Sequence, residues 1–185
     1  AETHVDRSIE TPVDFIETNI KGTYSLIESA RKIWGKRKDV LFFQISTDEV
    51  YGSIGKGFFS ESDLLNPSSP YSASKAAADH IVMSYLRTFD LPVMISRCTN
   101  NYGPHQYPEK LIPVVIKSIL ENRKIPVYGD GKNVRNWLFV DDHCEAILSL
   151  IKKGESGEIY NISGNVEASN NFIVDVLCKI MNRKL

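Results

Sequence analysis

The sequence predicts an α/β fold with a doubly wound, mainly parallel sheet and helices on both of its faces. Stretches with helical periodicity alternate with short apolar runs along the 185 residues. Two of these runs, "VLFFQIS" and "LPVMISR", are apolar over most of their length, as expected for strands covered on both faces. Strands that alternate with helices are joined by right-handed crossovers, which makes them parallel. In such sheets ligands bind beyond the carboxyl ends of the strands.

The first half of the chain gives the clearest signals for individual elements. Thr11 followed by Pro12 is typical of a helix start, and apolar residues recur at helical spacing from there to Gly35. The apolar run from Val40 to Ile45 predicts a strand, and a stretch rich in Gly, Ser and Pro follows it. The next expected elements are a loop over 52–70, a helix from Tyr71 to Phe89 and a buried strand over 91–97.

The second half alternates in the same way over shorter segments. We expect a helix from Pro108 to Asn122 and a final amphipathic helix from Asn170 to Arg183. Between them the sequence predicts a short strand with a turn at "IPVYGDG", a strand at "WLFV", Asp141 as the cap of a helix from Asp142 to Lys153, and a strand at "GEIYNIS".

The composition is that of an ordinary globular protein, with 42% hydrophobic and 24% charged residues. A formal net charge of −1 gives no general attraction to nucleic acid or to an anionic membrane. No apolar stretch is long enough to span a bilayer, and the opening "AETHVDRSIE" is charged rather than signal-like. Three widely spaced cysteines favour reduced thiols, and no histidines have metal-ligand spacing. We therefore expect a cytoplasmic protein with no metal, nucleic-acid or membrane partner.

The segment "STDEVYG" places two adjacent carboxylates, Asp48 and Glu49, at the end of a predicted buried strand. Unpaired charges are costly to bury, so this pair needs an explanation. One interpretation is a strand end where solvated charges mark the exit to a loop. The other is a general acid and a general base at the mouth of the sheet. Because consecutive strand residues point to opposite faces, the second interpretation requires the chain to leave regular strand geometry here.

The segment "YSASK" carries Tyr71 and Lys75 four residues apart on a predicted helix, so the two side chains share one face. A phenol with a pKa of about 10 is a poor base at neutral pH, but a nearby cation favours the phenolate and lowers that pKa. The pair is therefore a candidate proton acceptor for a sugar or alcohol hydroxyl. The motif alone is weak, because Tyr and Lys at this spacing also occur on surface helices.

Together the two motifs resemble the extended short-chain dehydrogenase/reductase family, in which a Ser or Thr, a Tyr and a Lys surround NAD. Within its nucleotide-sugar branch, the Thr-Asp-Glu triplet is similar to that of the dTDP-glucose 4,6-dehydratases. Seven ordered motifs are far more specific than one, and they imply a Rossmann-like fold. They are "AETHVDRSI", "FIETNIKGT", "STDEVYG", "PYSASKAAADH", "NNYGPHQYPEKLIP", "VYGDGKNVRNWLFVDDH" and "GEIYNISG".

The resemblance implies a lyase that converts dTDP-glucose to dTDP-4-keto-6-deoxyglucose. Tyr71, assisted by Thr47 and Lys75, would take the proton from the hydroxyl on carbon 4 while hydride passes to NAD. The resulting ketone acidifies the hydrogen on carbon 5, which Glu49 would remove. Asp48 would protonate the leaving hydroxyl of carbon 6, and hydride would then return to that carbon. Adjacent acids in a water-poor site oppose double ionisation, which suits an elimination that needs one ionised and one protonated carboxyl.

The same resemblance assigns the binding residues. NAD would be contacted by Thr18, Tyr71, Lys75 and Asn101. The nucleotide sugar would be contacted by Thr3, Thr47, Asn100, Lys110, Leu111, Pro126, Val127, Tyr128, Arg135 and Asn170, with Arg135 on the pyrophosphate. Simpler interpretations stay open, because Asn100 and Asn101 could form a turn before "YGP", and Arg135 could pair with Asp141 or Asp142. Members of the family commonly dimerise through two helices, which here would be 12–34 and 71–89.

The chain departs from the family pattern in one respect. Family members open with a glycine-rich turn that holds the NAD pyrophosphate at a helix N-terminus, and no such fingerprint occurs in this sequence. We therefore expect either a fragment or a fold completed by another chain, which alone binds NAD weakly or not at all. Residues 1–103 would be the C-terminal part of the NAD-binding domain. Residues 104–185 would mostly bind substrate, with about 137–153 returning to the first part.

Three alternatives to this lyase stay open on the sequence alone. They are a nucleotide-sugar 4-epimerase, a dehydratase for another nucleotide sugar, and a non-catalytic relative that binds a nucleotide sugar. The Asp48-Glu49 pair argues against an epimerase, which performs no elimination. The presence of Tyr71, Lys75 and both acids argues against a non-catalytic relative.

Overall fold

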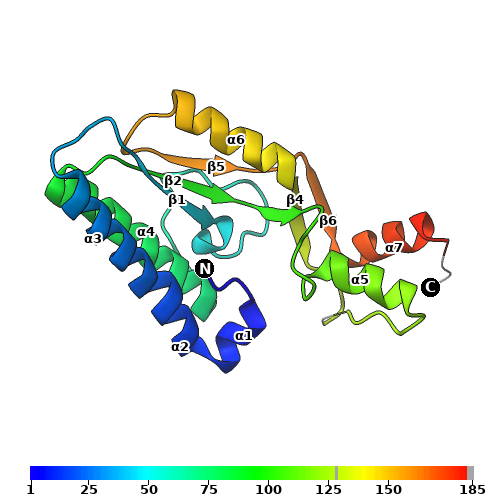
Figure 1. Cartoon of the computed structure of the whole chain (residues 1–185). Coiled ribbons are helices and arrows are strands. Elements are labelled where there is room, and N and C mark those ends of the chain that lie inside the picture. The colour runs from blue at the N-terminus through cyan, green and yellow to red at the C-terminus, as the bar shows by residue number, and fades with distance from the viewer. Residues whose placement is uncertain (128, 183–185) are drawn as a thin grey trace. The chain divides into compact units, whose positions relative to one another are not determined.

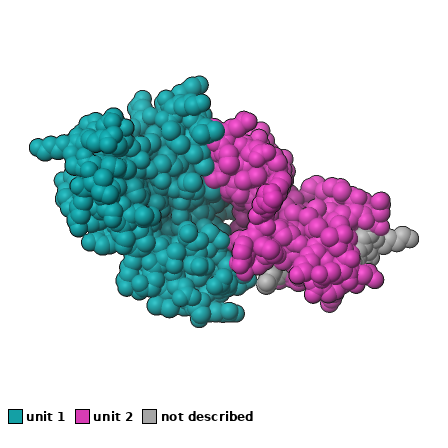
Figure 2. Space-filling view, viewed as in Figure 1, with its two compact units in different colours: residues 1–98, 147–162 teal, residues 99–146, 163–185 magenta. Residues whose placement is uncertain are grey.

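Residues 1–127 and 129–182 are described by the computed structural model, and they form the α/β fold that the sequence predicts. The chain divides into two compact units, which Figure 2 colours separately. Unit 1 comprises residues 1–98 and 147–162, and unit 2 comprises residues 99–146 and the chain from residue 163 onward. The domain limits expected from the sequence stay a prediction.

Unit 1 contains a parallel three-stranded sheet in the order β1-β2-β5 (Figure 1). Its strands are β1 (Phe42–Thr47), β2 (Val93–Cys98) and β5 (Ile159–Ile162). Every residue of the central strand β2 is buried, as its apolar sequence predicts. Among the described residues β1 pairs with β2 alone, and Ile45 in the middle of β1 is 47% exposed.

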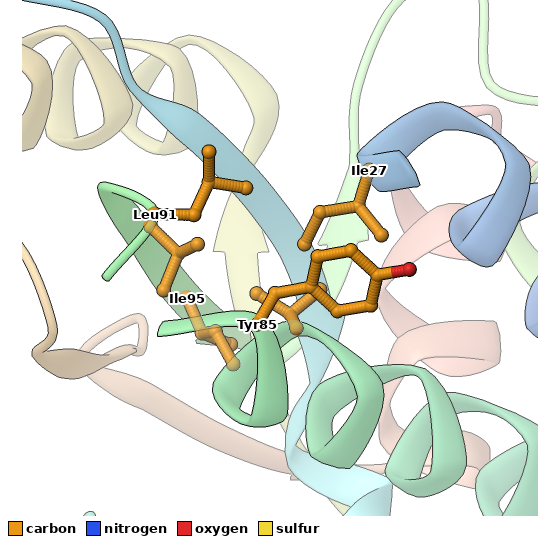
Figure 3. Close-up of a cluster of buried hydrophobic side chains, with 6 residues drawn as sticks. Ile27, Tyr85, Leu91 and Ile95 are labelled. Atoms are coloured by element: carbon orange, nitrogen blue, oxygen red, sulfur yellow. The ribbon is translucent and has the colours of Figure 1, made fainter. Parts of the chain in front are cut away.

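Two helices pack side by side along one face of this sheet, α3 (Gly22–Trp34) and α4 (Pro70–Phe89) (Figure 1). The core between helices and sheet is shown in Figure 3. Each fully buried aliphatic side chain contributes about 1.5–3 kcal/mol to stability. The cluster consists of Ile27 from α3, Val82 and Tyr85 from α4, and Leu91, Val93 and Ile95 from β2 and the residues before it.

The helix expected from Thr11 to Gly35 has an irregular middle. It consists of α2 (Pro12–Phe15), a π-helix (Ile16–Lys21) and then α3, and a short helix α1 (Val5–Glu10) precedes it. Pro12 occupies the first helical position as predicted. The Thr11 hydroxyl does not cap α2 but donates to the backbone oxygen of Arg7, 3.1 Å away at the end of α1.

Unit 2 contains the second sheet, in which β3 (Asn100–Tyr102) is parallel to β4 (Val134–Phe139) and β6 (Val166–Ser169) is antiparallel to β4. Helices α5 (Leu111–Leu120) and α7 (Asn170–Ile180) pack on each other through Val115, Val174 and Cys178. Helix α6 (Val140–Lys153) begins in unit 2, and its residues from 147 onward belong to unit 1.

Several local predictions are wrong. Residues 125–127 of the expected "IPVYGDG" strand are irregular, and Tyr128 lies outside the described residues. Asp141 is not a cap, because α6 begins at Val140 and places Asp141 inside its first turn. The last helix ends at Ile180, and Arg183 lies outside the described residues.

Among residues 1–127 and 129–182, no helix is both long and apolar enough to cross a membrane. The same residues contain no cluster of three or more His, Cys, Asp or Glu side chains that could hold a metal ion.

Candidate active site at the end of β1

The two adjacent acids follow β1 on a single turn of 3-10 helix, Asp48–Tyr51. Thr47 is still extended, and its hydroxyl accepts a hydrogen bond from the backbone N–H of Glu49 at 3.3 Å and donates to Asp48 Oδ1 at 3.3 Å. The alternation of the strand therefore ends at Thr47. This is the departure from strand geometry that the acid–base interpretation requires.

Gly52 ends this turn in a conformation that other residues rarely adopt, with φ of 87°. A Cβ atom at this position would lie 2.4 Å from the backbone oxygen of Asn66. The loop returns here, because the N–H of Asn66 donates to the Val50 oxygen at 3.0 Å. Glycine after "STDEVY" therefore allows the loop to pack directly under the turn that carries the acids.

Helix α4 begins with a reciprocal capping box, in which the side chains of Ser69 and Ser72 each accept from the other residue's backbone N–H. Pro70 occupies the first helical position, so Tyr71 lies in a well-defined first turn. Tyr71 and Lys75 are 8% and 6% exposed. The Lys75 ammonium donates to the backbone oxygen of Ile45 at 2.7 Å, which ties the helix to β1.

The phenol of Tyr71 shares its surroundings with three groups of the "STDEVYG" turn. Burial raises the pKa of Tyr71 most, the charge of Glu49 raises it further, and Asp48 adds a smaller effect in the same direction. A hydrogen bond with the Thr47 side chain acts in the opposite direction. A phenol, a hydroxyl and two carboxylates therefore lie within electrostatic reach of one another at the carboxyl end of β1, where parallel sheets bind ligands.

The sequence prediction of a lowered pKa for Tyr71 is wrong for this structure. The pKa of Tyr71 is raised, mainly by burial and by the charge of Glu49. The ammonium is instead engaged with the Ile45 carbonyl, and burial lowers the pKa of Lys75 itself. Spacing on a helix places two side chains on one face, but tertiary contacts decide which group each of them meets.

Three of the predicted binding residues, Asn100, Asn101 and Arg135, lie on strands of unit 2. Asn100 and Asn101 belong to β3, so they form a strand rather than a turn. Asn101 is held by His143, whose Nδ1 is 2.8 Å from its Oδ1, and donates to the Thr99 oxygen at 3.1 Å. Arg135 lies on β4 opposite Ala168 of β6. It makes no ion pair with any described residue, so the alternative pairing with Asp141 or Asp142 is not seen.

The remaining predicted binding positions belong to several different elements. Lys110 and Leu111 are the N-cap position and first residue of α5, and Asn170 is the first residue of α7. Pro126 and Val127 are exposed in an irregular segment, and Tyr128 is not described. In unit 1, Thr3 is exposed before α1, and Thr18 is exposed on the π-helix. The expected roles of all these residues stay predictions.

Sequence reasoning missed several buried polar residues beside the candidate site. Asn19, on the π-helix, accepts from the backbone N–H of Glu2 at 2.9 Å and donates to Ser74 Oγ at 2.9 Å. Asp79 and Arg97 form an ion pair of 3.0 Å whose side chains are 2% and 4% exposed. Asp79 follows Lys75 by one further helical turn, which is the one signal in the sequence that could have pointed to it.

The chain matches known proteins over nearly all of its length. A family model described as GDP-mannose 4,6 dehydratase matches residues 1–184. The dTDP-glucose 4,6-dehydratase of Xanthomonas campestris pv. campestris is 51% identical over 189 residues, which cover 99% of this chain and 54% of that protein.

Solved structures give a similar result. DesIV, a dTDP-glucose 4,6-dehydratase from Streptomyces venezuelae crystallised with NAD, is 45% identical with a TM-score of 0.95 over 100% of this chain and 56% of its own. The UDP-glucuronic acid 4-epimerase of Bacillus cereus is 33% identical, with a TM-score of 0.85 over 91% of this chain and 53% of its own. The chain thus spans about half the length of the proteins it matches.

Proposed function

The chain belongs to the GDP-mannose 4,6-dehydratase family, and from this premise we propose that it is part of a lyase that converts dTDP-glucose to dTDP-4-keto-6-deoxyglucose. One observation carries the proposal. At the end of β1 the Tyr71 phenol interacts with the Thr47 hydroxyl and is within electrostatic reach of the carboxylates of Asp48 and Glu49. An oxidation needs the first two groups. A dehydration needs an acid and a base in addition.

Each side chain has a defined task in this proposal. Tyr71 accepts the proton of the hydroxyl on carbon 4, and Thr47 hydrogen-bonds the phenol and keeps it oriented. Glu49 removes the hydrogen on carbon 5 once the neighbouring carbon is a ketone. Asp48 protonates the hydroxyl that leaves carbon 6 as water. Both carboxylates are half-buried, and a partly desolvated site strengthens their interactions with the developing charges.

The residues of unit 1 fit a nicotinamide cofactor. NAD would supply the hydride acceptor for carbon 4 and the hydride donor for carbon 6. Among the described residues, the Lys75 ammonium makes one hydrogen bond, to Ile45, and therefore retains two N–H donors for hydroxyl groups of a bound cofactor. We propose that Lys75, Tyr71, Thr18 and Asn101 hold NAD.

We propose that the nucleotide diphosphate is held by residues of the second part of the chain. Arg135 is half-buried on a strand and has no carboxylate partner among the described residues, so its guanidinium is available for a bidentate contact with phosphate. Residues 1–103 would then carry the catalytic groups and the cofactor. Residues 104–185 would mostly bind substrate, and about 137–153 would return to the first part. The remaining proposed contacts are Thr3, Thr47, Asn100, Lys110, Leu111, Pro126, Val127, Tyr128 and Asn170.

We also propose that this activity belongs to the cytoplasm. Cys98, Cys144 and Cys178 are thiols and take part in no disulfide among the described residues. Thiols are kept reduced in that compartment. A membrane-impermeant thiol reagent should leave Cys144 unlabelled when it is added to intact cells. The same reagent should label Cys144 after the cells are lysed.

The proposed reaction predicts a specific product. We expect the complete protein that carries this chain to convert dTDP-glucose into a 4-keto-6-deoxy sugar without net consumption of NAD. Product can be identified by mass spectrometry as a loss of one water molecule, with UDP-glucose and GDP-mannose as parallel substrates. If a dehydrated product formed only from another nucleotide sugar, the proposed reaction type would stand and the proposed nucleotide would be wrong. Formation of a 4-epimer without loss of water would contradict the proposal and would instead support the activity named for the epimerase from Bacillus cereus.

We further propose that the protein is a homodimer that buries parts of 12–34 and 71–89. The support is a set of exposed apolar side chains on these helices: Val13, Ile16, Tyr24, Leu26, Ile33 and Phe89. Leu26 and Ile33 lie seven residues apart on α3 and are 67% and 79% exposed. They therefore share one outer face of the helix.

The dimer proposal makes a measurable prediction. The double substitution Leu26→Lys and Ile33→Lys should raise the dissociation constant of the dimer by at least about tenfold, because two charges would have to be desolvated at the interface. Sedimentation velocity over a concentration series measures this change. The control Leu148→Lys alters a side chain on α6 that is 54% exposed and should leave the equilibrium unchanged. A wild-type protein that sediments as a monomer at all concentrations would contradict the proposal.

A further inference from the structure

A buried polar network lies directly behind the turn that carries Asp48 and Glu49. Its centre is Arg97 on β2, which is 4% exposed. The guanidinium donates through Nε to Asp79 Oδ2 at 3.0 Å and through a terminal nitrogen to the Tyr51 hydroxyl at 2.8 Å. It also lies over the Tyr51 ring, 4.8 Å from its centroid. One side chain therefore contacts both the helix α4 and the last residue of the 3-10 turn.

The strand register explains how this network is held. Arg97 pairs with Ser46 of β1 on one side and with Asn161 of β5 on the other. The Tyr51 hydroxyl donates to Asn161 Oδ1 at 2.9 Å, so it bridges Arg97 and Asn161. Asn161 in turn donates to the Phe59 oxygen at 3.1 Å. The end of the 3-10 turn is thereby anchored to two parallel strands and to the loop that follows.

The other end of the network reaches the redox residues. Tyr71, Lys75 and Asp79 follow one another at intervals of four residues on α4, so they lie along one face of the helix. The ion pair of Asp79 with Arg97 and the hydrogen bond of Lys75 with Ile45 fix this face against the sheet at two successive turns. The Tyr71 phenol lies one turn further along the same face. Its own turn is also fixed by the capping box at the start of α4, which the network does not contact.

We propose that Arg97 and Tyr51 are positioning residues that hold the acid pair, Asp48 and Glu49, in register with the Tyr71 phenol. The inference rests on the proposed dehydratase reaction, because only that reaction requires both sets of groups to reach one hexose. Both side chains lie in the interior, because Tyr51 is 3% and Arg97 is 4% exposed. The Arg97 guanidinium fixes α4 through Asp79, and its hydrogen bond to Tyr51 fixes the turn in relation to that helix.

The steps of the reaction differ in what they require from this network. Oxidation uses Thr47 at the end of β1 and Tyr71 and Lys75 on α4, a helix held by its capping box and by the Ile45 oxygen. Elimination also uses the two acids, whose turn is held at its far end by Tyr51. Catalytic groups must be placed within a fraction of an ångström of their productive positions, so a loosened turn should slow elimination more than oxidation.

The variant Tyr51→Phe tests this directly. It removes the hydroxyl that joins Arg97 and Asn161 while it keeps the ring that stacks on Phe59 at 4.9 Å. In single-turnover reactions of the complete enzyme with dTDP-glucose, we expect elimination to slow by about tenfold with little change in oxidation. Reduced nicotinamide, followed by its absorbance, should then accumulate before the product appears. A change that merely weakened the fold would lower both steps together.

A second measurement does not depend on turnover. Amide hydrogen exchange of residues 48–52 should become faster in Tyr51→Phe, because this turn loses one of its tertiary anchors. The variant Arg97→Lys should show the same pattern, since an ammonium can face Asp79 but cannot donate to Asp79 and Tyr51 in the same fork geometry. The matched control Tyr160→Phe removes a neighbouring hydroxyl on β5 that accepts from the Glu155 N–H at 2.9 Å, and it should change neither measurement.

The possible failures are distinguishable. A wild-type enzyme that forms no keto sugar would refute the proposed function, and the exchange data would still report on the anchoring of the turn. The positioning role would be refuted by a different result, in which the wild-type enzyme forms the product. In that case Tyr51→Phe and Arg97→Lys would change neither the amide hydrogen exchange of residues 48–52 nor the ratio of the elimination rate to the oxidation rate.

Discussion

Replacing Glu49 with Gln is expected to lower turnover of dTDP-glucose by about 10²–10⁴-fold while nucleotide-sugar binding changes little. The amide has nearly the same shape as the carboxylate, so the pocket is preserved, but it cannot accept the hydrogen of carbon 5. Oxidation at carbon 4 does not need this group. The variant should therefore accumulate reduced nicotinamide and the unreacted ketone, which rapid-quench analysis can detect.

A suitable control for this variant is Glu155→Gln. Glu155 is exposed in a turn of unit 1, away from the 3-10 helix in sequence, and its substitution should leave the rate within experimental error. Binding is measured by calorimetry with dTDP, which lacks the hexose and cannot react. Full activity of Glu49→Gln would remove Glu49 from the mechanism and leave Asp48 as the one carboxylate available for both proton transfers.

The substitution Tyr71→Phe is expected to suppress the oxidation itself. The rates at which reduced nicotinamide and product form should both fall by about 10²–10⁴-fold. The two variants thus differ in where they stop the reaction. Burial raises the pKa of Tyr71, and the charge of Glu49 raises it further. A raised pKa favours the protonated phenol at neutral pH, so the rate of oxidation should increase with pH as the phenolate fraction grows.

The pH profile gives the sharper test of Tyr71. The increase of the oxidation rate with pH should disappear in Tyr71→Phe and should move to lower pH in Glu49→Gln, where one charge that opposes the phenolate is removed. Tyr85→Phe is the matched control, because Tyr85 lies on the same helix, is 8% exposed and hydrogen-bonds Glu28 instead. A residual oxidation in Tyr71→Phe that retains the wild-type pH dependence would assign the base to another group.

Much of the fold could be predicted because its main elements carry strong local signals. The helices after Pro12 and Pro70 begin with proline at the first position, and β2 is a continuous apolar run covered on both faces. The short strands β3 and β6 were missed, since their pairing with β4 is decided by residues distant in sequence. The π-helix from Ile16 to Lys21 changes the helical repeat, so Ile16 and Tyr24, which regular helical spacing assigns to the buried face, are 46% and 51% exposed.

The candidate site divides in the same way. That both acids must leave strand geometry follows from the alternation of a strand, and the 3-10 helix of Asp48–Tyr51 agrees with this expectation. The surroundings of Lys75 could not be predicted, because its partner is a backbone oxygen on a strand thirty positions away in the sequence. The same holds for Arg97, whose contacts come from α4, the 3-10 turn and, through Tyr51, β5.

The outer strand of the first sheet has a consequence for anyone who produces this polypeptide by itself. On its outer side β1 has no partner among the described residues, and the side chain of Ile45 is 47% exposed. An uncovered strand edge offers unsatisfied backbone donors and acceptors to any extended segment that approaches it. Intermolecular strand addition, and hence precipitation during refolding, competes with correct assembly unless another strand covers that edge.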